Sequence, residues 1–195
     1  MLPLTAALNS LDEKCITVSF DDGDSTTCTV AQSILDGRGI RAMLYLSTDY
    51  VVQGTTYNSR RPLRAVTWLQ LGRWLEAGHE IGSHTNRHKS LTKCSDEEVL
   101  EELLTSKQTV KRELGVEIRH FAYPWGQHDE RTRLLFDRQQ DWASAATIER
   151  GINTNGTDKF RLKRELVDPS MSLAAAYLKL AVGRLKTSLC SVSGR

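Results

Sequence analysis

The residues of this chain with the clearest capacity for chemistry are two adjacent carboxylates and two histidines four positions apart. Asp21 and Asp22 end an apolar-leaning segment, VSFDD, and a glycine that permits a sharp turn follows them. His84 and His88 lie in the sequence IGSHTNRH. Their i,i+4 spacing predicts two imidazoles on one side of a helical turn, where both can reach one metal ion.

Together these side chains predict an open metal site that activates water. Two histidines and one carboxylate leave coordination positions for water and substrate. The other carboxylate would accept a proton from that water. The residues alone leave the order of the two aspartates open, because neighbours in an extended segment point to opposite sides. Zinc is the expected metal, and cobalt, nickel or iron would fit the same ligands.

Short apolar segments that end in these motifs indicate the strands that must position them. Strands are expected over residues 15–20, 42–46, 118–123, 142–148 and 161–167, and one ends near His84. Helices are expected over residues 29–35, 68–77, 96–114, 129–138 and about 172–187. A polar stretch over residues 49–66 is predicted to be a long loop that shapes the substrate cleft.

Capping residues mark where several of these helices begin and end. Thr67 precedes the second helix, and Ser95 with Glu98 has the pattern of a capping box. Gly115 is suited to end the long helix, and Ser172 to begin the last one. Alternating strands and helices imply a parallel sheet covered by helices. The motifs then fall at the carboxyl ends of strands, where α/β barrels place their chemistry.

Length and composition bound the class of protein. A chain of 195 residues with 39% hydrophobic and 26% charged residues fits one globular domain. The net charge of +2 gives no reason to expect nucleic acid as a partner, and no apolar run is long enough for a membrane span. The amino terminus lacks the pattern of a signal peptide, and four scattered cysteines are expected to be reduced thiols. These features predict a cytoplasmic protein.

Three segments carry a resemblance to a known family. Residues 19–23 (SFDDG), 78–88 (GHEIGSHTNRH) and 121–126 (FAYPWG) occur in the order and at the separations of its motifs. On these motifs the chain resembles the polysaccharide deacetylase family, the NodB-homology domain of carbohydrate esterases. The resemblance covers roughly residues 14–168. It implies an α/β fold, a distorted and incomplete (β/α)7 barrel, with residues 1–195 forming a single domain.

The resemblance also implies roles for individual residues. Asp21 would be the general base, and Asp22, His84 and His88 would hold one divalent metal ion. The backbone N–H of Trp125 would donate to the tetrahedral oxyanion.

Aromatic residues in the third segment suggest a wall for the substrate cleft. Tyr123, Pro124 and Trp125 are predicted to bind substrate, since the apolar face of a sugar stacks well on an aromatic ring. The alternative is that Tyr123 and Trp125 pack in the core. His79 is interpreted as a structural, hydrogen-bonding histidine.

The chain departs from the family pattern in two places. Many members carry an arginine, paired with the catalytic aspartate, where this chain has Ala122. Arg164 or Arg161 is the expected substitute, and a strand would turn only one of the two inward. Arg164 is favoured, because Lys163 and Arg161 would then share the other face, where two cations suit solvent.

Many members also have a late histidine that protonates the leaving amine, and no histidine follows His128 here. The general acid is therefore left unassigned, with His128, His120 and Asp21 itself as candidates.

These features predict a metal-dependent hydrolase that removes an N-acetyl or similar N-acyl group from a sugar, in surface-polysaccharide metabolism. A sugar O-acetyl esterase is the nearest alternative. A carbohydrate-binding protein that keeps the fold and metal without turnover is the rival from another class. A purely structural metal site is disfavoured, because structural zinc usually has four protein ligands. The sugar, its linkage and the oligomeric state are left open.

Overall fold

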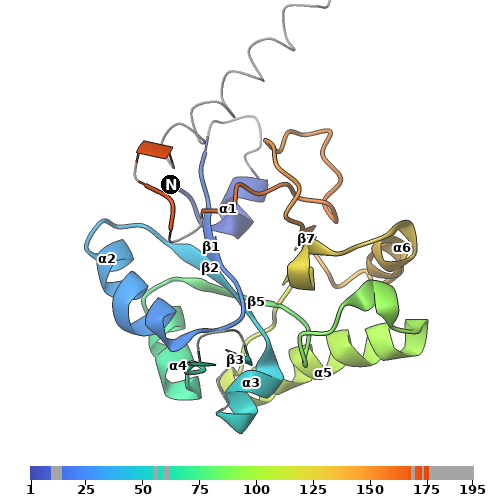
Figure 1. The fold of residues 1–195 in the computed structure, drawn as a ribbon, viewed down its shortest axis with the longest axis horizontal. Helices are drawn as coiled ribbons and strands as arrows, with labels where there is room; N and C mark the ends of the chain where they lie inside the picture. Colours follow the sequence, from blue (N-terminus) through green and yellow to red (C-terminus); the bar gives the residue numbers. More distant parts are fainter. Residues whose placement is uncertain (10–14, 55–56, 59–61, 168–169, 173, 176–195) are drawn as a thin grey trace, which may run out of the picture.

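A curled sheet of five parallel strands forms the centre of the computed structural model (Figure 1). Its strands are β1 (Val18–Phe20), β2 (Ala42–Leu46), β5 (Glu80–Ser83), β6 (His120–Ala122) and β7 (Ser144–Ala146). They lie in the order β1-β2-β5-β6-β7, and every neighbouring pair is parallel. The result is an open half-barrel, which confirms the predicted incomplete (β/α) barrel.

Helices pack on both faces of this sheet (Figure 1). They are α1 (Leu4–Leu8), α2 (Gln32–Asp36), α3 (Thr48–Gln53), α4 (Trp68–Glu76), α5 (Asp96–Leu114) and α6 (Glu130–Arg138). A π-helical turn, η1 (Thr27–Ala31), leads into α2, and two 3-10 turns, η2 (Leu91–Lys93) and η3 (Pro124–Gly126), follow β5 and β6. A small antiparallel hairpin joins β3 (Tyr57–Asn58) to β4 (Pro62–Leu63). The structure describes residues 1–9, 15–54, 57–58, 62–167, 170–172 and 174–175.

Local sequence signals set several helix ends as expected. Thr67 and Ser95 each form a complete capping box, which satisfies amides at the starts of α4 and α5. Gly115 ends α5 with a φ of 72°, a left-handed conformation that favours glycine. The predicted C-terminal helix lies almost wholly outside the described residues, although the Ser172 hydroxyl does accept the Ala175 N–H at 3.2 Å.

Two predicted elements were wrong. Residues 49–66 are not one long loop, because they contain most of α3 and the β3–β4 hairpin. Residues 161–167 do not form a strand, since a single parallel bridge from Leu162 to Ala146 is their one sheet contact among the described residues. The segment pairs too briefly to build a ladder, and Arg164 N–H instead donates to the Glu149 carbonyl at 2.9 Å.

The alternation of side chains along β2 divides the core into two layers. Leu44 and Leu46 belong to a cluster that includes Leu71 and Trp74 of α4. Their neighbours Met43 and Tyr45 belong to a second cluster, with Ala122, Ala146 and Leu162, against which Leu4 and Leu8 of α1 pack. All five residues of β2 are buried, which explains its continuous apolar sequence.

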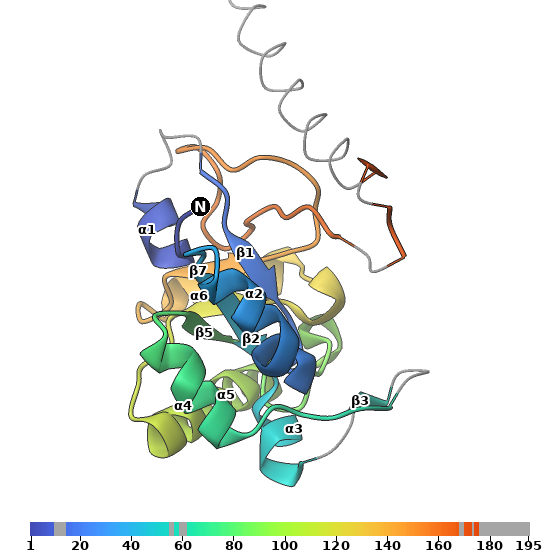
Figure 2. The ribbon, with the colours of Figure 1, turned by 90° about the vertical axis from the view of Figure 1, so that its left-hand side faces the viewer.

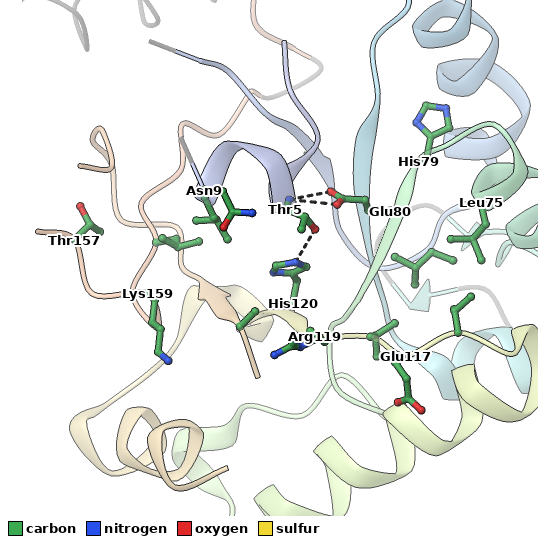
Figure 3. Close-up of a pocket in the computed structure, with 16 residues that line it drawn as sticks. Thr5, Asn9, Leu75, His79, Glu80, Glu117, Arg119, His120, Thr157 and Lys159 are labelled. Atoms are coloured by element: carbon green, nitrogen blue, oxygen red, sulfur yellow. Dashed lines mark hydrogen bonds between the residues drawn. The ribbon is translucent and has the colours of Figure 1, made fainter. Parts of the chain in front are cut away.

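Helix α1 closes the amino end of the sheet. The Glu80 carboxylate accepts the N–H groups of Leu4 at 2.6 Å and Thr5 at 3.2 Å, and the Thr5 hydroxyl lies 3.0 Å from His120 Nε2 (Figure 3). A cavity of about 640 Å³ lies beside them, lined mainly by residues at the amino ends of β5 and β6. Helices α1 and α3 lie at opposite ends of the molecule (Figure 2). Among the described residues, no helix has both the length and the apolar content to cross a membrane.

Candidate metal centre and active site

The predicted site residues meet at the carboxyl ends of the strands. Asp21 and Asp22 follow β1 directly, and His84 follows β5. The His84 N–H donates to the Leu46 carbonyl at the end of β2, at 2.9 Å. The Asp22 carbonyl accepts from Ser47 N–H at 3.3 Å. Because parallel strands end at one edge of the sheet, motifs more than 60 positions apart are brought together.

Three side chains form a compact set of metal-ligand atoms. Asp22 Oδ1 lies 3.4 Å from His84 Nε2 and 3.1 Å from His88 Nε2. The two Nε2 atoms lie 3.2 Å apart. Ligands that share one tetrahedral ion at 2.0–2.1 Å are about 3.3 Å from one another, so this spacing fits a zinc-sized cation. Among the described residues, this is the one group of its kind.

The tautomer of His84 also suits a metal ligand. Its Nδ1 lies 2.7 Å from the Ala122 carbonyl oxygen, which can only accept a hydrogen bond. Nδ1 must therefore carry a proton, so that when Nε2 is deprotonated its lone pair is directed at Asp22 and His88, as a metal ligand requires. A hydrogen bond of this kind from the second ring nitrogen commonly fixes the orientation of metal-binding histidines.

The predicted helical turn between the two histidines was wrong. Residues 84–88, which we call the histidine loop, have no helical structure. Thr85 and His88 instead have positive φ angles of 66° and 54°. The two imidazoles converge because the chain turns sharply at these residues, and not because residues 84–88 form a helical turn.

Backbone strain is concentrated at this site. Among the described residues, only four that are not glycine have a positive φ: Asp22, Thr85, His88 and Trp125. Two are candidate metal ligands, one lies between the histidines, and the ring of Trp125 packs against His88. Each such residue costs about 1–3 kcal/mol and persists only where its surroundings hold it in place.

Asp21 pairs with an arginine. The Arg164 guanidinium donates two hydrogen bonds to the Asp21 carboxylate, at 2.7 and 2.8 Å. Arg164 Nε donates to the Thr147 carbonyl at 2.8 Å, which fixes the guanidinium plane. Arg161 points elsewhere and pairs with Glu149 at 2.9 Å. Arg164 thus lies where the family arginine missing at Ala122 would act, although no strand positions it there.

Hydrogen bonds and nearby positive charge set the ionisation of both aspartates. Burial raises the pKa of Asp21, but positive charge at His84 and the hydrogen bonds from Arg164 outweigh it, so the net pKa lies below the ordinary value. The pKa of Asp22 is lowered as well, because hydrogen bonds from His84 and His88 outweigh its burial. Both carboxylates are therefore ionised near neutral pH, as a proton acceptor and a metal ligand must be.

The segment after β6 supplies one exposed aromatic ring at the site. The Trp125 side chain is 49% exposed, and its ring lies edge-on to His88 with centroids 4.4 Å apart. The Trp125 backbone N–H lies in the first turn of η3. The hydrogen bond that closes this turn comes from the next amide, Gly126 N–H, which donates to the Tyr123 carbonyl at 2.8 Å. Such an amide has no partner within its own helix and can donate to a ligand.

Two of the predicted substrate-binding residues were wrong. Tyr123 is fully buried, packs edge-on against Phe121 and Phe136, and donates its hydroxyl to the Phe160 carbonyl at 3.1 Å. Pro124 is buried beside it. Side chains with no exposed surface cannot form a cleft wall, so only Trp125 of this segment presents a ring to solvent.

The remaining histidines have protein partners away from the metal-ligand set. His79 Nδ1 accepts from Ala42 N–H at 3.0 Å and its ring stacks on Trp74, as its structural interpretation predicts. His120 is held by Thr5 and Ser144 at the amino end of the sheet, which excludes it as the general acid.

His128 lies behind the η3 turn. Its Nδ1 is 3.1 Å from the Gly126 carbonyl, and its Nε2 is 3.3 Å from Glu149 Oε1. Both ring nitrogens therefore face acceptors of the protein itself. His128 would have to leave these partners before it could protonate a substrate.

Sequence reasoning missed several residues that shape the site. Tyr50 of α3 places its ring 6.1 Å from that of His88, within the segment predicted to be a loop. The sequence STDY, with small polar and acidic residues before apolar ones, was the available signal for the start of a helix. Glu102 of α5 binds the histidine loop through Arg87, and no local pattern marks this contact.

Comparisons with known proteins agree on one family. The model of the polysaccharide deacetylase family matches residues 9–139. Chitin deacetylase 1 of Cryptococcus neoformans is 29% identical over 118 residues, which cover 60% of this chain and 22% of that protein. The chitin deacetylase of Amylomyces rouxii is 26% identical over 195 residues, which cover 87% of this chain and 43% of that protein. This chain thus spans less than half the length of either relative.

A solved structure shows the same fold. The Streptococcus pyogenes deacetylase PplD, determined in complex with acetate, superimposes with a TM-score of 0.80 at 21% identity. The match covers 91% of this chain and 78% of that one. At this identity the comparison supports the architecture of the half-barrel alone.

Proposed function

Because this chain belongs to the polysaccharide deacetylase family, we propose that it is a metal-dependent hydrolase that removes an N-acetyl group from a sugar. The observation that carries the proposal is that a metal-ligand set and an oriented carboxylate meet at two adjacent residues. Asp22 joins the two histidines as a ligand set, while Asp21, its neighbour, is ionised and held by Arg164. A ligand set beside a separate, oriented base is what hydrolysis of an unreactive amide requires.

The metal would be held by Asp22, His84 and His88. When bound, a divalent cation lowers the pKa of water and polarises an acyl oxygen. Zinc is the favoured ion for this donor set, with cobalt, nickel and iron as alternatives. Three protein ligands would leave coordination positions for water and substrate.

The chain's own residues would then carry the proton and the developing charge. Asp21 accepts a proton from the attacking water, and Arg164 holds its carboxylate in place. The Trp125 N–H donates to the acyl oxygen as it becomes an oxyanion. Breakage of the C–N bond requires a proton for the leaving amine. Asp21 is the residue at the site that already carries one, so we assign it this second transfer. The products are acetate and a free amine.

The exposed ring of Trp125 gives the site a surface suited to sugar. A pyranose presents an apolar face that packs on an aromatic ring, and the Tyr50 ring lies on α3 near the same histidine. Chitin, which gives the two relatives above their names, is an N-acetylated saccharide. We propose an N-acetylated saccharide as substrate.

This proposal is tested by incubating metal-loaded protein with acetylated sugars that are free, nucleotide-linked or polymeric, and measuring acetate release. We expect release from an N-acetylated saccharide. Release from O-acetylated sugars alone would instead identify an esterase. Sugar binding without any acetate release would support a carbohydrate-binding protein, the interpretation that the Arg164–Asp21 pair argues against.

The contact between Arg164 and Asp21 gives a second prediction. Arg164→Ala is expected to lower turnover and to move the acidic limb of the rate profile to higher pH. The guanidinium holds the pKa of Asp21 down, so its removal raises that pKa and protonates the base at a pH where the native enzyme is active. The measurement is kcat against pH with a fixed substrate.

Arg161→Ala is the matched control. It removes the same functional group three residues away, where the partner is Glu149 instead of Asp21. We expect its acidic limb to coincide with that of the unmodified protein. Equal shifts in both variants would show that the effect comes from net charge and not from the contact with Asp21.

A further inference from the structure

Helix α5 sends two buried polar side chains toward the histidine loop. Glu102 and Ser106 lie four residues apart, on one face of the helix, and both are fully buried. Their neighbours Val99, Leu103 and Val110 form the apolar face of the same helix. A carboxylate is costly to bury unless every oxygen is paired, so its position here calls for a specific partner.

Glu102 is paired with a single residue of the histidine loop through both oxygens. Oε2 accepts the backbone N–H of Arg87 at 2.8 Å, and Oε1 accepts Arg87 Nε at 2.7 Å. Arg87 directly precedes His88, whose φ of 54° is left-handed. The carboxylate thus fixes the Asn86–Arg87 peptide and the Arg87 side chain, directly before a strained candidate ligand.

Ser106 supports the loop at its other strained residue. Its hydroxyl lies 2.7 Å from that of Ser83, and Ser83 Oγ accepts the backbone N–H of Thr85 at 3.1 Å. Thr85 is a β-branched residue at a φ of 66°, a conformation that such residues rarely adopt. Helix α5 therefore reaches both strained points of the loop.

Helix α3 holds the residue between these two points. The Asn86 carbonyl accepts the Asp49 N–H at 2.9 Å, and its side-chain oxygen accepts the Thr48 hydroxyl at 2.8 Å. Each of the three residues between the histidines is thus hydrogen-bonded, directly or through Ser83, to another element. Of the groups named here that hold the loop, Glu102 of α5 is the one buried charged side chain.

We propose that Glu102 is a positioning residue, which preorganises the histidine loop so that His88 meets Asp22 and His84 around a metal ion. The inference rests on the proposed metal-dependent function and extends it from the ligands to a residue that touches none of them. The loop conformation is strained, so it needs bonds from outside, and Glu102 supplies two of them to Arg87, the residue before His88. Removal of this anchor should weaken metal binding more than it weakens the fold.

The test is metal affinity in Glu102→Gln. The amide has nearly the shape of the carboxylate, but its NH₂ group would face a donor of Arg87. We expect zinc affinity, measured by competition with a chromophoric chelator, to fall about 10–100-fold, the range found when groups that orient metal ligands are removed. The absorption spectrum of the cobalt-loaded variant should change as well.

Glu101→Gln is the matched control. Glu101 is the adjacent residue of α5, pairs with the same Arg87 at 3.4 Å, and undergoes the same chemical change. Its side chain is 62% exposed, so the ion pair contributes little. We expect its zinc affinity to stay within about twofold of the unmodified protein, because both bonds from Arg87 to Glu102 are kept.

Two further variants separate positioning from general stability. Leu103→Ala removes buried apolar contacts of α5 and should lower the melting temperature without changing zinc affinity. If Glu102→Gln does not fold, Arg87→Lys decides the question, since it loses the Nε bond and keeps the backbone N–H. It should bind zinc more weakly than the unmodified protein.

The outcomes distinguish the two proposals. If the unmodified protein binds no metal, the proposed function fails and the inference fails with it. If the unmodified protein and Glu102→Gln bind zinc equally, Glu102 has only a structural role and the inference alone is overturned. Unchanged affinity in Arg87→Lys would overturn it in the same way.

Discussion

Replacement of Asp21 by asparagine is expected to lower the deacetylation rate about 10²–10⁴-fold, the contribution typical of a positioned general base. Asparagine has the same shape but cannot accept the proton from water. Its side-chain oxygen still offers Arg164 one acceptor, and Thr147 offers another, so the local structure should persist. The measurement is kcat with an N-acetylated substrate, together with metal content and melting temperature.

Asp22→Asn is the control for this experiment. It makes the same change at the adjacent residue, whose Oδ1 lies against both histidine nitrogens. We expect this variant to lose metal affinity, whereas Asp21→Asn keeps it. Loss of metal from Asp21→Asn, with retention in Asp22→Asn, would show that the roles of the two aspartates are reversed.

Removal of the metal is expected to abolish activity. A chelator that strips the ion should reduce acetate release to background, and addition of zinc or cobalt should restore it. His84→Ala should not be restored at the same metal concentration, because the site keeps only two of its three ligands. Elemental analysis should find close to one metal ion per chain in the unmodified protein and much less in the variant.

His128→Ala is the matched control for the metal experiment. It removes a histidine that is bound to Gly126 and Glu149 and lies outside the ligand set. Its metal content should equal that of the unmodified protein. Equal metal content in His84→Ala and the unmodified protein would overturn the ligand assignment, whatever the activity of the two proteins.

The sequence by itself determined most elements of the fold and the residues that meet at the site. Alternating apolar and amphipathic segments predict a parallel sheet with its helices, and the boundaries of β2 and α6 agree with the structure to the residue or nearly so. The capping boxes at Thr67 and Ser95 fixed two helix starts, because capping depends on neighbours three residues away. The motifs had to meet, since parallel strands end at one edge.

Only the tertiary structure decided how the residues are held there. The histidine loop is left-handed at Thr85 and His88 and is hydrogen-bonded to Glu102 and to α3. These partners are not local in sequence, so the i,i+4 spacing predicted a helical turn instead. Tyr123 and Trp125 have similar rings, but only burial, a property of the whole fold, separates core from cleft.

The contact between Arg164 and Asp21 joins residues 143 positions apart. The sequence suggested Arg164 through the alternation of side chains in a strand that the structure does not contain. Arg164 is instead held by two other hydrogen bonds, from its backbone N–H to the Glu149 carbonyl and from its guanidinium to the Thr147 carbonyl. Sequence patterns report neighbours along the chain, whereas the geometry of this site depends on contacts between elements that are neighbours only in space.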